Sequence, residues 1–212
     1  MRVVLASASP ARLALLRAAG LAPEVAISGI DEDAVTASLG LSDPSATVAA
    51  LARAKAEAVA AEIGSAPHRG EALVIGCDSL LDLDGRSFGK PHDPDEATAR
   101  WAAMRGREGI LRTGHHVIRT GNGIRAGSWP TAHGVGSTVV HFANLSDDDI
   151  AAYVATGEPL QVAGAFTIDG RGSAFVDRIE GDHGNVVGIS VPLLRALVGQ
   201  LGVAWPDLWT AE

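Results

Sequence analysis

The sequence predicts an α/β fold, one domain in which helices flank a central sheet. Residues 73–75 form an apolar run of the kind found in strands that are buried on both faces. Residues 3–20 change from a strand pattern to a helix pattern, and residues 109–142 are strand-like and rich in glycine. At 212 residues the chain is long enough for one sizeable domain, which we expect to span residues 1–212.

Charge and composition exclude several kinds of partner. The formal net charge is −8 and no basic stripe is present, which argues against a broad nucleic-acid-binding face. No apolar run approaches the ~20 residues that a membrane span needs. The single cysteine, Cys77, leaves no internal disulfide and fits a reducing compartment. We therefore expect a cytoplasmic protein in which local cations and a divalent metal would hold any polyanionic ligand.

The first segment combines features that suit phosphate. A strand pattern at residues 3–6 leads to Ser9 as an N-cap and Pro10 at the first helical position. The helix start then faces the exit of the strand and presents free backbone N–H groups together with the side chains of Ser7, Ser9 and Arg12. Since Ser-Pro is also an ordinary way to begin a helix, phosphate binding and simple capping both stay open.

An acidic run follows the second predicted strand. Residues 24–30 have a strand pattern, and Asp31, Glu32 and Asp33 come directly after it. On a loop such carboxylates are most often solvated. At the end of a strand, one of them could instead ligate a hard cation such as Mg²⁺.

The longest predicted helix covers residues 43–64, with Asp43 as its N-cap and Gly64 as its end. Its inward stripe repeats every three or four residues and contains one lysine, Lys55. The stripe comprises Val48, Leu51, Lys55, Val59 and Ile63. The Lys55 ammonium either snorkels from the edge of the stripe or points into a cleft, and both interpretations stay open.

The stretch 72–91 is the one around which we expect the fold to be arranged. Its apolar strand is predicted to end on Asp78, and ligands bind at the C-terminal edge of strands in open α/β sheets. Asp84-Gly85 predicts a tight hairpin turn, after which the chain returns to Lys90. One ribbon would thus bring Asp78 and Lys90 towards one place. Cys77 lies inside the strand without a nearby base and is predicted to be a buried structural thiol.

The rest of the chain is predicted to be mostly structural. Helices are expected at residues 93–106 and 146–157 and from Pro192 onwards. Residues 121–123 predict a hairpin turn, and residues 127–136 a loose loop. The histidines lack the spacing of a metal site.

Eight segments, in order along the chain, resemble the Maf family of nucleoside triphosphate pyrophosphatases. They are LASASPAR (5–12), IDE (30–32), AKA around Lys55, VIGCDSLLDLDGRSFGKP (74–91), STVVHF (137–142), LSDDDIAAYVATGEPL (145–160), AGAF (163–166) and GNVVG (184–188). Each is weak alone, but so many motifs in register argue against chance. The resemblance implies a mixed, twisted sheet with flanking helices, two lobes around a central cleft, and a homodimer.

The resemblance also implies an activity, the cleavage of a nucleoside triphosphate to the monophosphate and pyrophosphate with Mg²⁺ or Mn²⁺. Such a reaction removes non-canonical or excess nucleotides. Asp78 matches the proposed catalytic aspartate of the family, and Glu32 would ligate the metal with it. The phosphate-binding positions carried over are Ser7, Ser9, Arg12, Lys55 and Lys90.

The chain departs from the family pattern at four places. Ala11 stands where the family has the first of two arginines, and Ser79 replaces a common threonine. Gln161-Val162 replaces an Asp-Lys pair, and Asp169 replaces a glutamine. Gln161 and Asp169 therefore mark a candidate base-recognition loop with an altered composition.

The residues support the same chemistry by their types. A triphosphate must be neutralised before water can approach phosphorus, and Arg12, Lys55 and Lys90 with a divalent ion form a suitable set. Asp78 could bind the metal or orient and deprotonate the water, which attacks the α-phosphorus. The alternative is a non-catalytic nucleotide-binding regulator of cell division, since a fold does not fix an activity. An unrelated metabolic enzyme on the same fold is a third reading.

Overall fold

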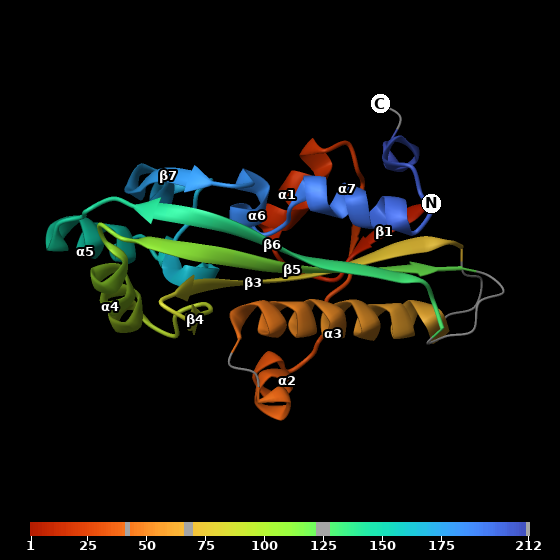
Figure 1. Ribbon diagram of the computed structural model, residues 1–212, viewed down its shortest axis with the longest axis horizontal. Helices are drawn as coiled ribbons and strands as arrows, with labels where there is room; N and C mark the ends of the chain where they lie inside the picture. The colour runs from red at the N-terminus through yellow and green to blue at the C-terminus, as the bar shows by residue number, and fades with distance from the viewer. Residues whose placement is uncertain (41–42, 66–69, 122–127, 211–212) are drawn as a thin grey trace.

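The computed structural model describes residues 1–40, 43–65, 70–121 and 128–210. Within these ranges, seven strands form one mixed sheet in the order β2-β1-β3-β5-β6-β7, with β4 paired to β3 beside this path. The pairs β1–β2 and β1–β3 are parallel, and the others are antiparallel. The expected α/β fold with a mixed sheet and flanking helices is confirmed (Figure 1).

Three long strands extend through the whole molecule and join its two ends (Figure 1). They are β3 (Ala72–Leu83), β5 (Glu108–Thr120) and β6 (Thr131–Phe142). The shorter strands are β1 (Arg2–Leu5), β2 (Glu24–Val25), β4 (Arg86–Phe88) and β7 (Val176–Glu180). The sheet therefore has a continuous middle with short strands at its edges.

Helices cover both faces of this sheet. The helices are α1 (Pro10–Ala18), α2 (Glu32–Leu39), α3 (Pro44–Ser65), α4 (Pro94–Met104), α5 (Asp147–Ala155), α6 (His183–Val187) and α7 (Val191–Gln200). Four short 3₁₀ helices are η1 (Glu158–Gln161), η2 (Ala163–Ala165), η3 (Arg171–Phe175) and η4 (Trp205–Leu208). In Figure 1, α3 runs below the sheet with α2 beneath it, whereas α1, α6 and α7 lie above.

Helix α3 lies very close to the sheet because glycines face it. A Cβ on Gly76 would lie 2.2 Å from the Ala52 carbonyl oxygen, and one on Gly114 would lie 2.2 Å from that of Val48. Most of the predicted stripe is buried against the strands, including Lys55. This close packing sets the position of Lys55 relative to β3.

Two large apolar clusters occupy opposite ends of the long strands. One includes Leu5 and Ile75 from the sheet and Leu194 from α7. The other surrounds Trp101 of α4, whose ring meets that of Phe142 edge-on at 5.7 Å. Each of these two clusters packs one end of the long strands against its flanking helices.

The predicted N-caps are confirmed. The Ser9 hydroxyl accepts from the Arg12 N–H, and the Asp43 carboxylate accepts from the Ala46 N–H. The side chains of Asp93 and Ser146 cap α4 and α5 in the same way. The N-caps could be predicted from the sequence because each cap bonds within one turn of its own helix.

Several predicted boundaries are wrong. Strand β3 does not end on Asp78 but continues to Leu83, because β5 pairs with it from Ala72 to Asp82. Asp78 is therefore in the middle of the strand. The strand expected at residues 24–30 is only β2, and the acidic run starts helix α2, whose N-cap Asp31 accepts from the Ala34 N–H.

Two further boundaries differ from expectation. Helix α3 continues through Gly64 to Ser65. Residues 131–136, expected in a loop, belong to β6, where they pair with residues 113–118 of β5. The turn predicted at residues 121–123 extends outside the described residues.

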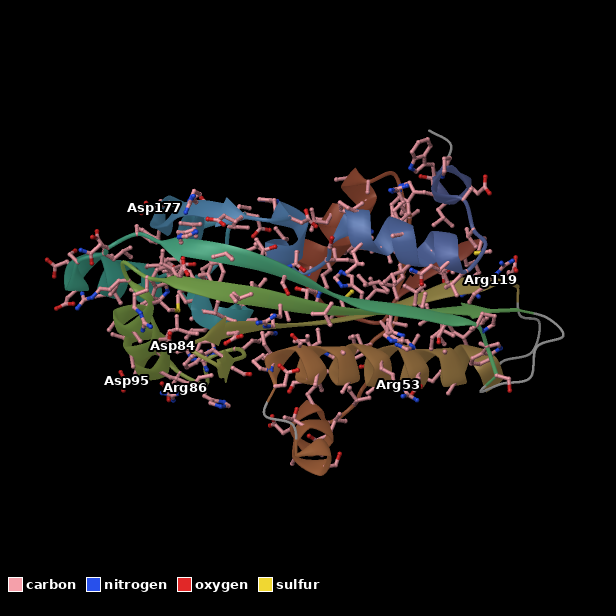
Figure 2. The ribbon with its side chains drawn as sticks, viewed as in Figure 1. Arg53, Asp84, Arg86, Asp95, Arg119 and Asp177 are labelled. Carbon is pink, nitrogen blue, oxygen red and sulfur yellow. The ribbon has the colours of Figure 1, made fainter. Side chains whose placement is uncertain are left out.

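Charged side chains of both signs are spread over the surface. Figure 2 shows Arg53 on α3, Arg119 at one end of the sheet, and Asp84, Arg86 and Asp95 near the β3–β4 turn and α4. Within the described residues, no helix has both the length and the apolarity to cross a membrane.

Candidate active site

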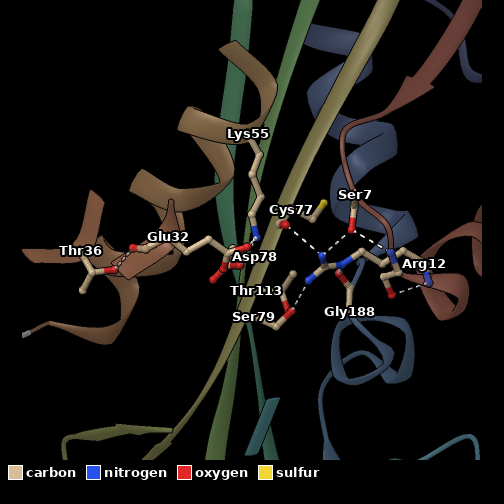
Figure 3. Close-up of polar contacts among 11 residues, drawn as sticks. Ser7, Arg12, Glu32, Thr36, Lys55, Cys77, Asp78, Ser79, Thr113 and Gly188 are labelled. Atoms are coloured by element: carbon tan, nitrogen blue, oxygen red, sulfur yellow. Dashed lines mark hydrogen bonds and ion pairs between the residues drawn. The ribbon is translucent and has the colours of Figure 1, made fainter. Parts of the chain in front are cut away.

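Three charged side chains from three elements meet at the middle of β3. The Lys55 ammonium lies 2.6 Å from an Asp78 carboxylate oxygen and 2.8 Å from a Glu32 carboxylate oxygen. One nitrogen thus bridges two carboxylates (Figure 3). The helical stripe placed Lys55 towards the sheet, where its ammonium is buried in ion pairs with Asp78 and Glu32.

Burial distinguishes the members of this triad. The side chains of Lys55 and Asp78 are each 9 % exposed, whereas that of Glu32 is 52 % exposed. Burial raises the pKa of Asp78, and the positive charges of Lys55 and Arg12 oppose that rise. The carboxylate of Asp78 is therefore held as one half of a buried ion pair, with Glu32 at its solvent side.

Arg12 reaches β3 from the opposite face of the sheet (Figure 3). Successive side chains of a strand point to opposite faces, so Cys77 and Ser79 lie on the face opposite Asp78. The Arg12 guanidinium donates to the Cys77 carbonyl at 3.0 Å and to the Ser79 hydroxyl at 3.0 Å. It also donates to the Ser7 hydroxyl at 3.0 Å and to the Gly188 carbonyl at 2.7 Å.

The first loop is organised by its own hydroxyls. The Ser7 hydroxyl accepts from the Ser9 N–H as well as from Arg12, and the Ser9 hydroxyl caps α1. Ser7 and Arg12 are buried, whereas Ser9 is half-buried. In this arrangement the loop residues bind one another and the sheet.

Three other predicted positions take no part in the ion pairs of the triad. The side chains of Lys90, Gln161 and Asp169 are exposed. Within the described part of the chain, none of the three forms a hydrogen bond or ion pair with Glu32, Lys55 or Asp78. The hairpin does form, and its return leg runs back along β3, with Phe88 opposite Leu81 and a Cβ on Gly89 3.5 Å from the Leu80 side chain, before the chain reaches Lys90.

A surface pocket lies at the far end of the molecule. Its lining includes Asp84, Arg107 and Asp177 and none of the triad. The expected central cleft is therefore not this pocket.

Comparison with known proteins gives the family. The sequence profile described as Maf-like protein matches residues 2–201. The chain belongs to the Maf-like family.

The chain is 58 % identical to a protein of Streptomyces coelicolor over 208 residues, which cover 98 % of this chain and 94 % of the relative. A protein of Streptomyces avermitilis is 56 % identical over 99 % of this chain and 95 % of its own length. A Rhodococcus jostii protein is 53 % identical over 99 % of this chain and 96 % of its own. All three relatives carry the name nucleoside triphosphate pyrophosphatase.

The carboxylates of this Maf-like chain fit a divalent cation. One oxygen of Asp78 and one of Glu32 each lie within 2.8 Å of the same ammonium nitrogen, so both converge on one positive charge. No group of three His, Cys, Asp or Glu side chains suited to a metal occurs among the residues described. Mg²⁺ does not need one, because it commonly binds through one or two carboxylates together with substrate phosphates.

Sequence reasoning missed a polar network between the sheet and α6 in this Maf-like protein. The Ser79 hydroxyl lies 2.9 Å from that of Thr113, which donates to the Asn185 carbonyl at 2.9 Å. The Asn185 side chain donates in turn to the Leu111 carbonyl at 3.1 Å. The contributing residues are far apart in the chain, and only the glycines around Asn185 signalled that the backbone passes close to another element there.

Proposed function

We propose that this protein hydrolyses nucleoside triphosphates to the monophosphate and pyrophosphate. The observation that carries the proposal is the convergence of Asp78 and Glu32 on Lys55, because two carboxylates and one cation match what metal-assisted phosphoryl chemistry requires. The relatives' shared name supports the same reaction.

Two residues of the chain have separate roles in this hydrolysis. Asp78 orients a water molecule and takes its proton, so that the water oxygen attacks the α-phosphorus. The bond between the α-phosphorus and its bridging oxygen to the β-phosphate breaks, and pyrophosphate leaves. Lys55 stays beside Asp78 and stabilises the negative charge that develops on the phosphate oxygens.

Asp78 and Glu32 are the residues that would hold Mg²⁺ or Mn²⁺. When bound, the ion supplies Lewis-acid polarisation of the phosphate oxygens and offsets their charge. The triad presents two carboxylates beside one ammonium, so it offers the oxygen ligands that such an ion prefers.

Purified protein incubated with a panel of nucleoside triphosphates and Mg²⁺ or Mn²⁺ tests the proposal. We expect equal amounts of monophosphate and pyrophosphate. Asp78→Asn should lower kcat by about 10²-fold or more, because the base and metal-ligand roles both need the carboxylate. Circular dichroism confirms folding, and Asp148→Asn on the surface of α5 is the control. Near-normal turnover in Asp78→Asn would remove the proposal.

The assay also separates the alternative of a nucleotide-binding regulator. Stoichiometric binding of a triphosphate without release of pyrophosphate would favour that reading. We further propose nucleotide house-cleaning as the role, the cytoplasm as the location and a homodimer as the assembly. Sedimentation at several protein concentrations tests the dimer.

A further inference from the structure

Arg12 is engaged by protein groups on nearly every side. A guanidinium has five N–H donors, and four of those of Arg12 point at acceptors of this chain. The residue is only 9 % exposed. A phosphate that bound Arg12 bidentately would have to displace bonds already made to β3 or to Ser7.

The bond to Cys77 satisfies a backbone carbonyl of β3 that lies beyond the end of β1. Strand β1 ends at Leu5, and its last bond to β3 runs from the Ala6 N–H to the Ile75 carbonyl at 2.8 Å. The next carbonyl on that side of β3 belongs to Cys77, two residues on, and it accepts from Arg12 Nη1. The guanidinium therefore stands where the next backbone N–H of a longer β1 would stand.

Two contacts of Arg12 flank Asp78 in sequence. The Cys77 carbonyl precedes Asp78 and the Ser79 hydroxyl follows it, so both neighbours of the aspartate are fixed from the opposite face. On the other face, the Asp78 carboxylate is paired with Lys55, which comes from a helix, and through it with Glu32.

The turn after α6 is shaped to receive the guanidinium. Gly188 has a φ of 128°, and a Cβ there would lie 3.0 Å from Arg12 Nε. The Gly188 carbonyl accepts from that same Nε at 2.7 Å. Arg12 thus ties the C-terminal half of the chain to the part of β3 that bears Asp78.

We propose that Arg12 is a positioning residue, which braces β3 on both sides of Asp78 and so fixes the direction in which that carboxylate faces Lys55 and Glu32. The proposal rests on the proposed function for its catalytic consequence. It differs from the phosphate-binding role that the resemblance implies for Arg12.

Steady-state kinetics distinguishes the two roles. Arg12→Met should lower kcat by about 10²-fold, because a small misplacement of a reacting group has effects of that size. KM for the triphosphate and the inhibition constant of pyrophosphate should change by less than about threefold. Arg17→Met, on the exposed side of α1, is the matched control and should leave all three constants unchanged. A rise of KM and of the pyrophosphate inhibition constant, with kcat kept, would show a phosphate ligand and overturn the proposal.

Conservative variants sharpen the test and cover a failure of Arg12→Met to fold. Ser79→Ala removes one brace contact and no charge, and it should lower kcat with KM kept. Arg12→Lys keeps the charge but cannot reach Cys77, Ser79 and Gly188 together, so it should not restore kcat. Full activity of Arg12→Lys would show that charge alone matters and would refute the brace.

Hydrogen–deuterium exchange tests the brace without any activity. Exchange in the peptide covering residues 76–80 should be faster in Arg12→Met and in Ser79→Ala than in the parent protein, and unchanged in Arg17→Met. If the parent protein hydrolyses no triphosphate but this exchange pattern appears, the proposed function fails and the brace stands. If exchange is unchanged in both brace variants, the brace fails whatever the activity.

Discussion

Two glycines set the distance between α3 and the sheet. Gly76 on β3 and Gly114 on β5 face the helix, and each lies against a backbone carbonyl of α3. Backbone atoms on both sides leave no flexible group that could move aside. The position of Lys55 opposite Asp78 depends on this contact.

Gly114→Ala should lower the free energy of unfolding by about 3 kcal/mol, the upper part of the range for overpacked interiors. The added methyl would lie 2.2 Å from the Val48 carbonyl oxygen. Gly199→Ala is the control, because a Cβ there meets nothing within 4 Å. Helix propensity predicts a gain of up to about 1 kcal/mol for this control in α7. Urea unfolding measures both variants, and equal stability of the two would contradict the prediction.

His115 is a buried neutral histidine that joins β5 to α7. Its Nε2 accepts from the Ser190 N–H at 2.8 Å, and its Nδ1 lies 3.0 Å from the Thr113 carbonyl, to which it donates. Burial lowers the pKa of His115 from 6.5 to about 4. At pH values between these two, the unfolded chain binds a proton that the folded chain does not.

The stability that His115 contributes is therefore full above pH 6.5 and is lost as the pH falls towards 4. The shift corresponds to about 3 kcal/mol at most. Urea unfolding between pH 7.5 and 4.5 should show a smaller loss of stability for His115→Gln than for the parent protein. Parallel curves for the two proteins would refute the assignment.

At the residue scale, the sequence indicated the direction of Lys55 but not the burial of Arg12. The stripe of α3 is a local periodicity, and it gave the direction of Lys55 without any knowledge of its partner. The partners of Arg12 lie up to 176 positions away, at Gly188, and no local pattern specifies such a contact. Its burial could not be inferred because a basic residue one turn into a helix is usually exposed.

Among the elements, the segment after α5 depends on one carboxylate. Glu158 accepts hydrogen bonds from Tyr153 and Thr167 side chains and from the backbone N–H groups of Arg171 and Gly172. Burial raises the pKa of Glu158, but these bonds outweigh it and bring the value to about 2. The carboxylate thus fixes the segment that bears Asp169.

Glu158→Gln should loosen this segment, because the amide nitrogen cannot accept a hydrogen bond and would face either the Arg171 N–H at Oε2 or the three donors that now meet Oε1. Hydrogen–deuterium exchange of residues 168–175 should become faster. Asp169→Asn, on the same segment but exposed, is the control and should not change the exchange. Unchanged exchange in Glu158→Gln would show that other contacts hold the segment.

Helix α2 shows where element prediction failed. Asp31 followed by two acidic residues is a helix-start signal, and Gly40 in the left-handed region ends the helix. The run was instead expected to follow a strand, either as a solvated loop or as a cation ligand at the strand end, because residues 24–30 have a strand pattern. Figure 1 shows α2 below α3, outside the sheet layers, and the Glu32–Lys55 ion pair joins it to the site.

In the whole molecule, strand pairing decided what the sequence left open. The apolar run of β3 was evident, but its continuation past Asp78 depends on β5, which is antiparallel to it over eleven residue pairs. Pairing over that length is a tertiary property, and alternation alone does not reveal it. The consequence for the site is that Asp78 lies within the sheet and is fixed by both faces.

The two apolar clusters lead to a prediction about unfolding. Trp101 lies inside one cluster, and Trp205 of η4 packs against the other. Because β3, β5 and β6 pass through both ends, we expect residues 1–212 to unfold as one cooperative unit.

Variants that keep only Trp101 or only Trp205, with phenylalanine at the other tryptophans, report each end separately. Their urea midpoints should coincide with each other and with the midpoint from far-ultraviolet circular dichroism of the same variant. Two midpoints that differ by more than the fitting error would show that the two ends unfold as separate units. The pairing of the long strands between the ends would then be lost before the weaker end unfolds.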